Sequence, residues 1–370
     1  MRAARAARVT SGCSILPDYR KTALETSTSP LALRRRCDRK RSMKRRPPLP
    51  LLLVLALSLL AASCSTKVKV FDDYTDPLRE VVLRGDADEK VLLLPIRGVI
   101  THEPDRGVFT TRPGTVQEVA AHLKKARKDP EIKAVVLTVN SPGGGVTASD
   151  VIHHQLTRFK EETGKKLVVC MLDVAASGGY YVSLPADRIY AHPTTVTGSV
   201  GTIFIQPQVA GLLDKLGVEV RAYTSGEHKD MGSPFRHPSP EEQRIFQDLI
   251  DEYSGRFLEL VAASRPVKKD DLTRVADARI FTARQAQSIG LVDEIGFLED
   301  ALDGARTLAG LPDDARVVAY RRTVYADDTA YNPVTSGPGG RDPRILDLGP
   351  AEAARNLQTG FHHLWLPQAR

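Results

Sequence analysis

The sequence predicts an α/β domain in which amphipathic helices cover a largely parallel β-sheet. Between residues 91 and 322, short apolar segments rich in Val and Ile alternate with segments of helical periodicity. The connections between them are short, and glycine-rich turns follow two of the apolar segments. Alternation of strand and helix with short connections is the pattern of a parallel sheet, and it suits one domain at residues 91–322.

The first 63 residues predict targeting rather than folded protein. Residues 1–42 are rich in Arg and have no periodic apolar face, so we interpret them as a disordered artefact of start-site choice. Residues 43–63 begin with Met-Lys-Arg-Arg and continue into an apolar stretch that is too short to span a bilayer, which is typical of a signal peptide. The stretch ends in Leu-Ala-Ala-Ser before Cys64, which resembles a bacterial lipobox and predicts lipidation of Cys64. An ordinary export signal or an uncleaved anchor is the alternative.

Charge and cysteine content narrow the function classes. Residues 1–63 hold 14 Lys and Arg against 3 Asp and Glu, whereas the remaining residues hold 38 against 42. The basic balance of the whole chain therefore belongs to the targeting segment, and nucleic-acid binding has no support. Beyond Cys64 the only cysteine is Cys170, in an apolar segment, so the sequence predicts no disulfide framework.

The elements follow from periodicity and capping signals. Residues 64–90 are charged and are expected to be a tether. A helix at Thr147–Glu162 is expected to be capped by Thr147 or Ser149. The long helix at 240–264 carries Ile245, Leu249, Tyr253, Phe257 and Val261 on one face, and residues 323–370 are rich in Pro, Gly and Asp and predict a loose tail. The other expected elements are strands at 91–100, 132–139, 167–172, 188–191, 218–223 and 315–321, helices at 116–128 and 209–216, a helical turn at 180–184, and a helix–turn–helix within 280–302.

Ser177 is the candidate nucleophile. The apolar strand at 167–172 leads into Ala-Ala-Ser-Gly-Gly at 175–179, just before the expected helical turn. A strand that enters such a turn exposes a serine hydroxyl beside free backbone N–H groups. A second glycine-rich turn, Ser-Pro-Gly-Gly-Gly at 141–145, lies between a strand and a helix, which suits N–H groups directed at an oxygen anion. A phosphate cradle or a plain turn is the alternative, although neither nucleotide-binding glycine pattern is present.

The residues alone leave the general base open. His228 and Lys229 lie in a turn rich in Gly and Ser, and a Ser–His–Asp arrangement of Ser177, His228 and Asp173 is one option. Lys229 is the other option. To accept a proton at neutral pH, a lysine must have its pKa lowered from about 10.4 to about 7–8, which burial can achieve at roughly 4 kcal/mol.

Several blocks resemble the signal peptide peptidase A (protease IV) family of serine proteases. They span roughly residues 91–311 in the family's order, and they are NSPGGGV at 140–146, AASGGYY at 175–181, ADRIYAHPTTVTGSVGTI at 186–203, SGEHKDMGSPFR at 225–236 and IFTARQAQSIGLVDEIG at 280–296. The resemblance implies the Clp-protease/crotonase-like fold of repeated ββα units and a Ser–Lys dyad in place of a triad.

The resemblance also implies a role for each matching residue. Ser177 is the nucleophile, Lys229 is the general base, and Ser199 holds the lysine amine by a hydrogen bond. Gly144 and the N–H of Gly178 form the oxyanion hole, with Gly143 as the other candidate for the first position. No metal or cofactor is implied.

The chain carries one copy of the domain, as in the single-domain members, which assemble into a ring or dome. In such a homo-oligomer Ser177 and Lys229 of one site come from different subunits. Family members usually keep a transmembrane helix, whereas this chain has the lipobox-like ending, and Ser65 after Cys64 favours the outer membrane.

The sequence therefore predicts a serine endopeptidase that hydrolyses signal peptides or other short apolar peptides at the bacterial cell envelope. It is expected to be membrane-anchored at its N-terminus, with the catalytic domain in the periplasm or otherwise outside the cytoplasmic membrane. The alternative is a non-proteolytic envelope lipoprotein that binds peptides or scaffolds an assembly. A crotonase-type acyl-CoA enzyme is a weaker alternative, because an exported protein meets little acyl-CoA.

Overall fold

The computed structural model describes residues 76–106, 111–323, 325–332 and 360–365, all within one compact unit, Val68–Arg370. The expected signal peptide at 43–63 and the lipidation site Cys64 lie outside these residues. No helix in the described ranges has both the length and the hydrophobicity needed to cross a membrane.

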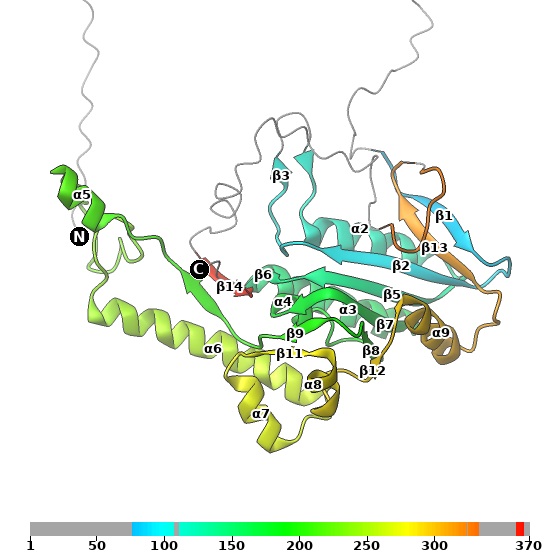
Figure 1. The fold of residues 1–370 in the computed structure, drawn as a ribbon. Helices are drawn as coiled ribbons and strands as arrows, with labels where there is room; N and C mark the ends of the chain where they lie inside the picture. The colour runs from blue at the N-terminus through cyan, green and yellow to red at the C-terminus, as the bar shows by residue number, and fades with distance from the viewer. Residues whose placement is uncertain (1–75, 107–110, 324, 333–359, 366–370) are drawn as a thin grey trace, which may run out of the picture. The chain divides into compact units, whose positions relative to one another are not determined.

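A mixed sheet forms the centre of the described residues (Figure 1). Its strand order is β1-β13-β2-β5-β7-β8-β12, and β9 pairs with both β7 and β11. All pairs are parallel except β1–β13 and β9–β11. The bounds are β1 Arg79–Arg84, β2 Lys90–Arg97, β5 Ile132–Ser141, β7 Lys166–Ala176, β8 Arg188–Ala191, β9 Val196–Gly198, β11 Ile280–Thr282, β12 Glu294–Ile295 and β13 Arg316–Arg321.

Helices cover both faces of this sheet. On one face α2 (Thr115–Lys128) and α3 (Val146–Thr163) pack Leu123 and Leu156 into the larger apolar cluster. On the other face α9 (Leu298–Ala309) contributes Leu302 to a smaller cluster with the alternate side chains of β2, β5 and β7. Because both faces of the sheet are buried, the central strands have continuous apolar sequences rather than alternating ones. The predicted α/β class is confirmed, and β5, β6 and α3 follow one another as a ββα unit, the repeat that the sequence resemblance implies.

Two expectations at the ends of the domain need correction. Arg79–Arg84, expected within the tether, forms β1 because it pairs with β13. Gly360–Leu364, expected within a loose tail, forms β14, which lies between β6 (Gly143–Gly145) and β10 (Ile203–Ile205) and is antiparallel to both. A short hairpin, β3 (Asp105–Arg106) with β4 (Thr111–Arg112), completes the strands.

The helix after the Ser-Pro-Gly-Gly-Gly turn begins differently from the prediction. Its N-cap is Gly145, and neither Thr147 nor Ser149 caps it. Ser149 instead lies inside the first turn and donates its hydroxyl to the Gly145 carbonyl at 3.1 Å. The helix therefore starts directly from β6, which brings the glycines of β6 against its first turn.

The segment Val209–Ser239, which we call the arm, connects β10 to the long helix α6 (Pro240–Ser264) and contains α5 (Ala210–Leu216). The predicted strand at 218–223 is wrong, because no strand of the described chain lies beside it, and Val218, Val220 and Tyr223 are exposed. Figure 1 shows α5 at the end of α6 that is distant from the sheet.

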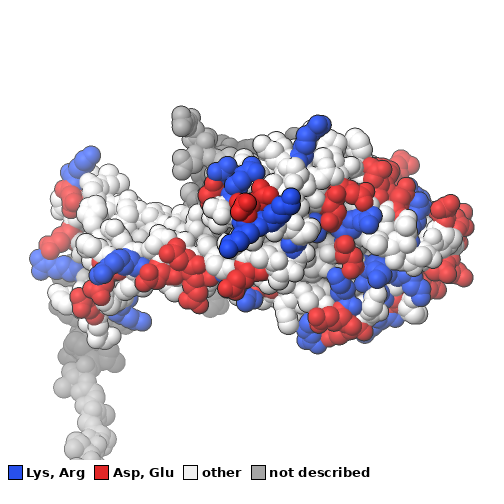
Figure 2. Space-filling model, turned by 90° about the horizontal axis from the view of Figure 1, so that it is seen from below, with Lys and Arg blue, Asp and Glu red and all other residues white. Residues whose placement is uncertain are grey.

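Helix α6 begins at the predicted residue, Pro240. Pro240 occupies its first turn, and Ser239 and Glu242 form a capping box. It is followed by α7 (Lys269–Ala276) and α8 (Ala283–Ser288). Figure 2 shows acidic and basic side chains interspersed on the lower face of the molecule, which matches the near balance of charge beyond residue 63.

Candidate active site

Ser177 lies on a strained turn between β7 and α4 (Gly178–Tyr181). Its backbone has φ 52° and ψ −117°, a conformation that costs a non-glycine residue of order 1–3 kcal/mol. The turn is held because the Ser177 N–H donates to the Gly198 carbonyl at 2.7 Å and the Tyr181 N–H donates to the Ser177 carbonyl at 2.9 Å. Strain of this kind at a strand-to-helix serine is the geometry of a nucleophile elbow.

Ser199 follows directly from the strand that holds this turn. β9 pairs with the last residues of β7, so that Ala176 is opposite Gly198. Ser199 also has a positive φ, 53°, and its N–H donates to the Arg279 carbonyl at 2.8 Å. Its side chain lines a cavity of about 590 Å³ together with residues of β10, Ala278, Leu364 and Trp365. The structure thus brings Ser177 and Ser199 onto adjoining strand ends.

The glycine turn presents one backbone N–H towards β14. Ile100 N–H donates to the Gly143 carbonyl and Gly145 N–H donates to the Ile100 carbonyl, both at 2.9 Å. Because N–H groups alternate in direction along a strand, the N–H and carbonyl of Gly144 point to the opposite side, where β14 pairs with it. The Gly143 N–H donates instead to the Ser141 hydroxyl at 3.1 Å. Gly144 is therefore the better placed of the two expected donors.

A carbonyl oxygen from β14 lies on the side of β6 to which the Gly144 N–H points. His363 is the residue of β14 opposite Gly144. Its carbonyl oxygen is so close to the turn that a Cβ on Gly143 would be 1.9 Å from it, and a Cβ on Gly178 would be 3.0 Å from it. Gly178 is the first residue of α4, whose N–H has no partner within the helix. The expected oxyanion residues Gly144 and Gly178 therefore converge on one peptide carbonyl.

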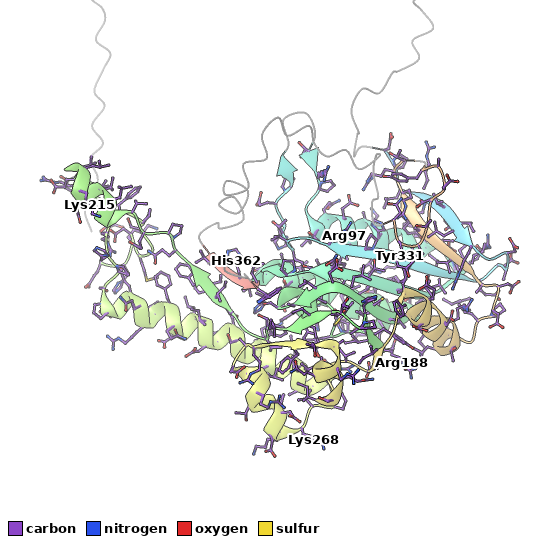
Figure 3. All side chains as sticks on the ribbon, viewed as in Figure 1. Arg97, Arg188, Lys215, Lys268, Tyr331 and His362 are labelled. Carbon is purple, nitrogen blue, oxygen red and sulfur yellow. The ribbon has the colours of Figure 1, made fainter. Side chains whose placement is uncertain are left out.

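Lys229 is not beside the serines. It is exposed in the arm, and among the residues that the structure describes no hydrogen bond joins it to Ser177 or Ser199. Its loop is tied to the start of α6 by Arg236, which binds Asp230 at 2.7 Å and Glu242 at 2.8 Å. Figure 3 shows Lys215 of the same arm at the opposite end of α6 from β14, which carries His362. The described residues of this chain do not bury Lys229, as its role as a neutral base would require.

The histidine alternative is not assembled either. His228 is exposed in the arm and faces Glu241, with 3.9 Å between Nε2 and Oε1. Asp173, on β7, instead accepts a 2.7 Å hydrogen bond from the Asn140 amide. Glu227, His228 and Glu241 bring potential metal ligands within 4.8 Å of one another, but all three are exposed.

Sequence reasoning missed the residues that surround β14. The His363 ring is stacked on Tyr181 and packs against Phe257, at centroid distances of 5.2 and 4.9 Å. Its Nδ1 lies 3.2 Å from the Thr202 hydroxyl and 2.9 Å from the Gly201 carbonyl. Burial lowers the pKa of His363 to about 4, against weaker opposing effects of the Gly201 carbonyl and Asp150. The only signal in the sequence was the apolar face of α6.

Comparison with known proteins agrees with the resemblance. Residues 159–312 match Peptidase family S49. A signal peptide peptidase SppA by name, from Enterococcus faecium, is 35% identical over 273 residues, which cover 73% of this chain and 79% of that protein. A Synechocystis protein named as a protease is 39% identical over 258 residues, which cover 68% and 91%. The solved structure of a ClpP1 mutant from Listeria monocytogenes aligns with 58% of this chain and 95% of its own, at 19% identity and a TM-score of 0.37.

Proposed function

This chain belongs to peptidase family S49, the signal peptide peptidase A family of serine peptidases, and we propose that it is an endopeptidase with a Ser177–Lys229 dyad. Its proposed substrates are signal peptides and other short apolar peptides. The observation that carries the proposal is the strained Ser177 turn, whose next residue, Gly178, lies together with Gly144 against a single peptide carbonyl.

The proposed reaction is acyl transfer. Neutral Lys229 takes the Ser177 proton, and the serine oxygen attacks the peptide carbonyl carbon. The N–H groups of Gly144 and Gly178 stabilise the oxyanion, and each donor of this kind is worth about 2.7–4 kcal/mol in the transition state. The ammonium then protonates the leaving amine. The same lysine deprotonates a water molecule, which hydrolyses the acyl-enzyme. Ser199 holds the lysine amine.

We propose that Lys229 comes from a second copy of the chain. Two features support this arrangement: Lys229 is exposed, and Ser199 lines a cavity that is open to a side chain from outside. The arm also exposes several large apolar side chains, and contiguous exposed apolar surface marks interaction sites. They are Leu212, Leu216, Val218, Val220, Tyr223 and Phe235. A homo-oligomer that buries the arm would desolvate Lys229, as its role as a base requires.

The proposed location is the bacterial cell envelope. The support is in the sequence, where the signal-peptide pattern at 43–63 ends at Cys64. Lipidation of Cys64 would anchor the chain to a membrane with the catalytic domain outside the cytoplasmic membrane.

Three substitutions test the dyad. We expect Ser177→Ala and Lys229→Ala each to lower kcat by at least about 10³-fold towards unfolded casein and a synthetic signal peptide. Lys215→Ala is the matched control, since Lys215 is another exposed lysine of the arm. Full activity in Lys229→Ala would exclude the dyad and would make His228 the next candidate for the general base. Absence of cleavage by a folded, oligomeric wild type would favour the peptide-binding alternative.

A further inference from the structure

β14 fills a gap between two strand edges. It pairs with β6 through His362, His363 and Leu364, and with β10 through Gly360, Phe361 and His362. Trp365 N–H extends the pairing to the Pro142 carbonyl at 2.8 Å. Without β14, the facing edges of β6 and β10 would both present unpaired backbone groups, which is the arrangement that binds an extended peptide by strand addition.

β14 pairs with β6 in the register that is expected of a bound peptide substrate. An extended peptide that is to be cleaved must pass Ser177 with one carbonyl oxygen at the oxyanion donors. The His363 carbonyl occupies that position, against Gly143 and Gly178 and opposite Gly144. The bond between His363 and Leu364 therefore stands where a scissile bond would stand.

Two side chains of β14 pack against aromatic rings of the domain. Phe361 and His363 are two residues apart, so they point to the same side of the strand. Phe361 packs against Phe204 and Tyr253, at centroid distances of 4.8 and 5.3 Å, and His363 packs against Tyr181 and Phe257. Tyr253 and Phe257 are consecutive positions of the apolar face of α6, so this helix contacts both side chains.

A peptidase cannot act while its own carbonyl fills the oxyanion site. On the basis of the function proposed above, we propose that β14 occupies the substrate strand position, so that the C-terminal segment of the chain competes with substrate for the active site. The aromatic surroundings of Phe361 and His363 then define the substrate class: extended peptides with flat or apolar, uncharged side chains at the residue before the scissile bond and two residues upstream of it.

Two changes to the full chain test this inference. One chain ends at Thr359, and the other keeps its length but carries Phe361→Ser and His363→Ser. We expect both to raise kcat/KM towards a fluorogenic peptide by about tenfold, through a lower KM and an unchanged kcat, because the competing strand is removed or weakened. A lower melting temperature with no rise in kcat/KM would show that β14 is a structural strand and overturn the inference.

A synthetic peptide supplies the complementary test. Labelled Gly-Phe-His-His-Leu-Trp, residues 360–365, is added to the chain that ends at Thr359 and carries Ser177→Ala, and binding is followed by fluorescence anisotropy. We expect the peptide to bind this shortened chain and to bind full-length Ser177→Ala more weakly. A control peptide with the same residues in scrambled order should bind neither chain. Equal binding to both chains, or none to either, would contradict the inference.

The binding experiment separates this inference from the proposed function. If no variant cleaves peptides but the shortened chain alone binds the labelled peptide, the substrate position of β14 stands and the peptidase proposal fails. If wild type cleaves, but shortening changes neither kcat/KM nor binding, the peptidase proposal stands and the inference about β14 fails.

Discussion

The backbone N–H of Ser177 donates a 2.7 Å hydrogen bond to the carbonyl of Gly198. This bond ties the turn of Ser177, the proposed nucleophile, to β9, and the next residue of the chain after β9 is Ser199. Gly198 has φ +86°, and a Cβ there would lie 2.5 Å from the Phe281 ring. The positive φ and the contact with Phe281 favour glycine at position 198. Because Gly198 bonds to Ser177 and directly precedes Ser199, it links the positions of the two serines.

The strain at Ser177 predicts an inverse relation between stability and activity. Ser177→Gly removes the hydroxyl and relieves the positive φ, so we expect it to abolish cleavage and raise the free energy of unfolding by about 1–2 kcal/mol. Ser177→Ala should be equally inactive but should lack the stability gain, because alanine keeps the Cβ. Chemical denaturation of the three chains measures the difference, and equal stability of the Gly and Ala variants would contradict the strain.

Arg236 is predicted to position Lys229. Its guanidinium holds both Asp230, the neighbour of Lys229, and Glu242 at the start of α6. Arg236→Ala should lower kcat about 10- to 100-fold, because a displaced base loses the geometry of the reaction. Arg221→Ala is the matched control, since Arg221 makes an exposed pair with Glu219 in the same arm. A melting curve should show both variants folded, and unchanged kcat in Arg236→Ala would refute the positioning role.

Docking of β14 is predicted to depend on pH through His363. Its pKa is about 4 when buried, mainly through desolvation, and 6.5 is the ordinary value for the undocked side chain. As pH falls from 6.5 towards 4, the undocked strand binds a proton that the docked strand does not, so docking weakens. At pH 5 the loss is roughly 2 kcal/mol, or about 30-fold.

The measurement is the ratio of kcat/KM between the chain that ends at Thr359 and the full chain. This ratio should fall towards one between pH 7 and pH 5, and protonation of the catalytic base cancels in it. In the chain with His363→Phe the ratio should not vary with pH. A constant ratio in the wild type would show that His363 does not control docking.

Local patterns were sufficient for most of the fold. The central strands and helices lie within a few residues of the predicted bounds, because β-branched runs and helical periodicity are properties of short segments. Helix α6 was predicted at its observed bounds, Pro240–Ser264, from the helical spacing of its apolar residues. Residues 218–223 have strand propensity but no partner strand in the described chain, so propensity alone misled the prediction there.

The residues of the candidate site could be predicted from the sequence only where a single short motif indicates a single role. Ser177 and the glycine turns could be found from the sequence because each is a short run of small residues directly after a predicted strand. The strand Gly360–Leu364 could not, because it pairs with residues 143–145 and 203–205, which are far away in the sequence. The proposed base could not be placed either, since Lys229 is exposed in the arm and has no hydrogen bond to Ser177 among the described residues.

Mixing two inactive variants tests the central claim most directly. Ser177→Ala and Lys229→Ala chains are co-assembled in equal amounts, and cleavage of a signal peptide is compared with that of wild type. If each site combines Ser177 of one copy with Lys229 of another, random mixing restores roughly a quarter of the wild-type activity. No recovery in mixed oligomers of confirmed composition would contradict a dyad that is shared between copies.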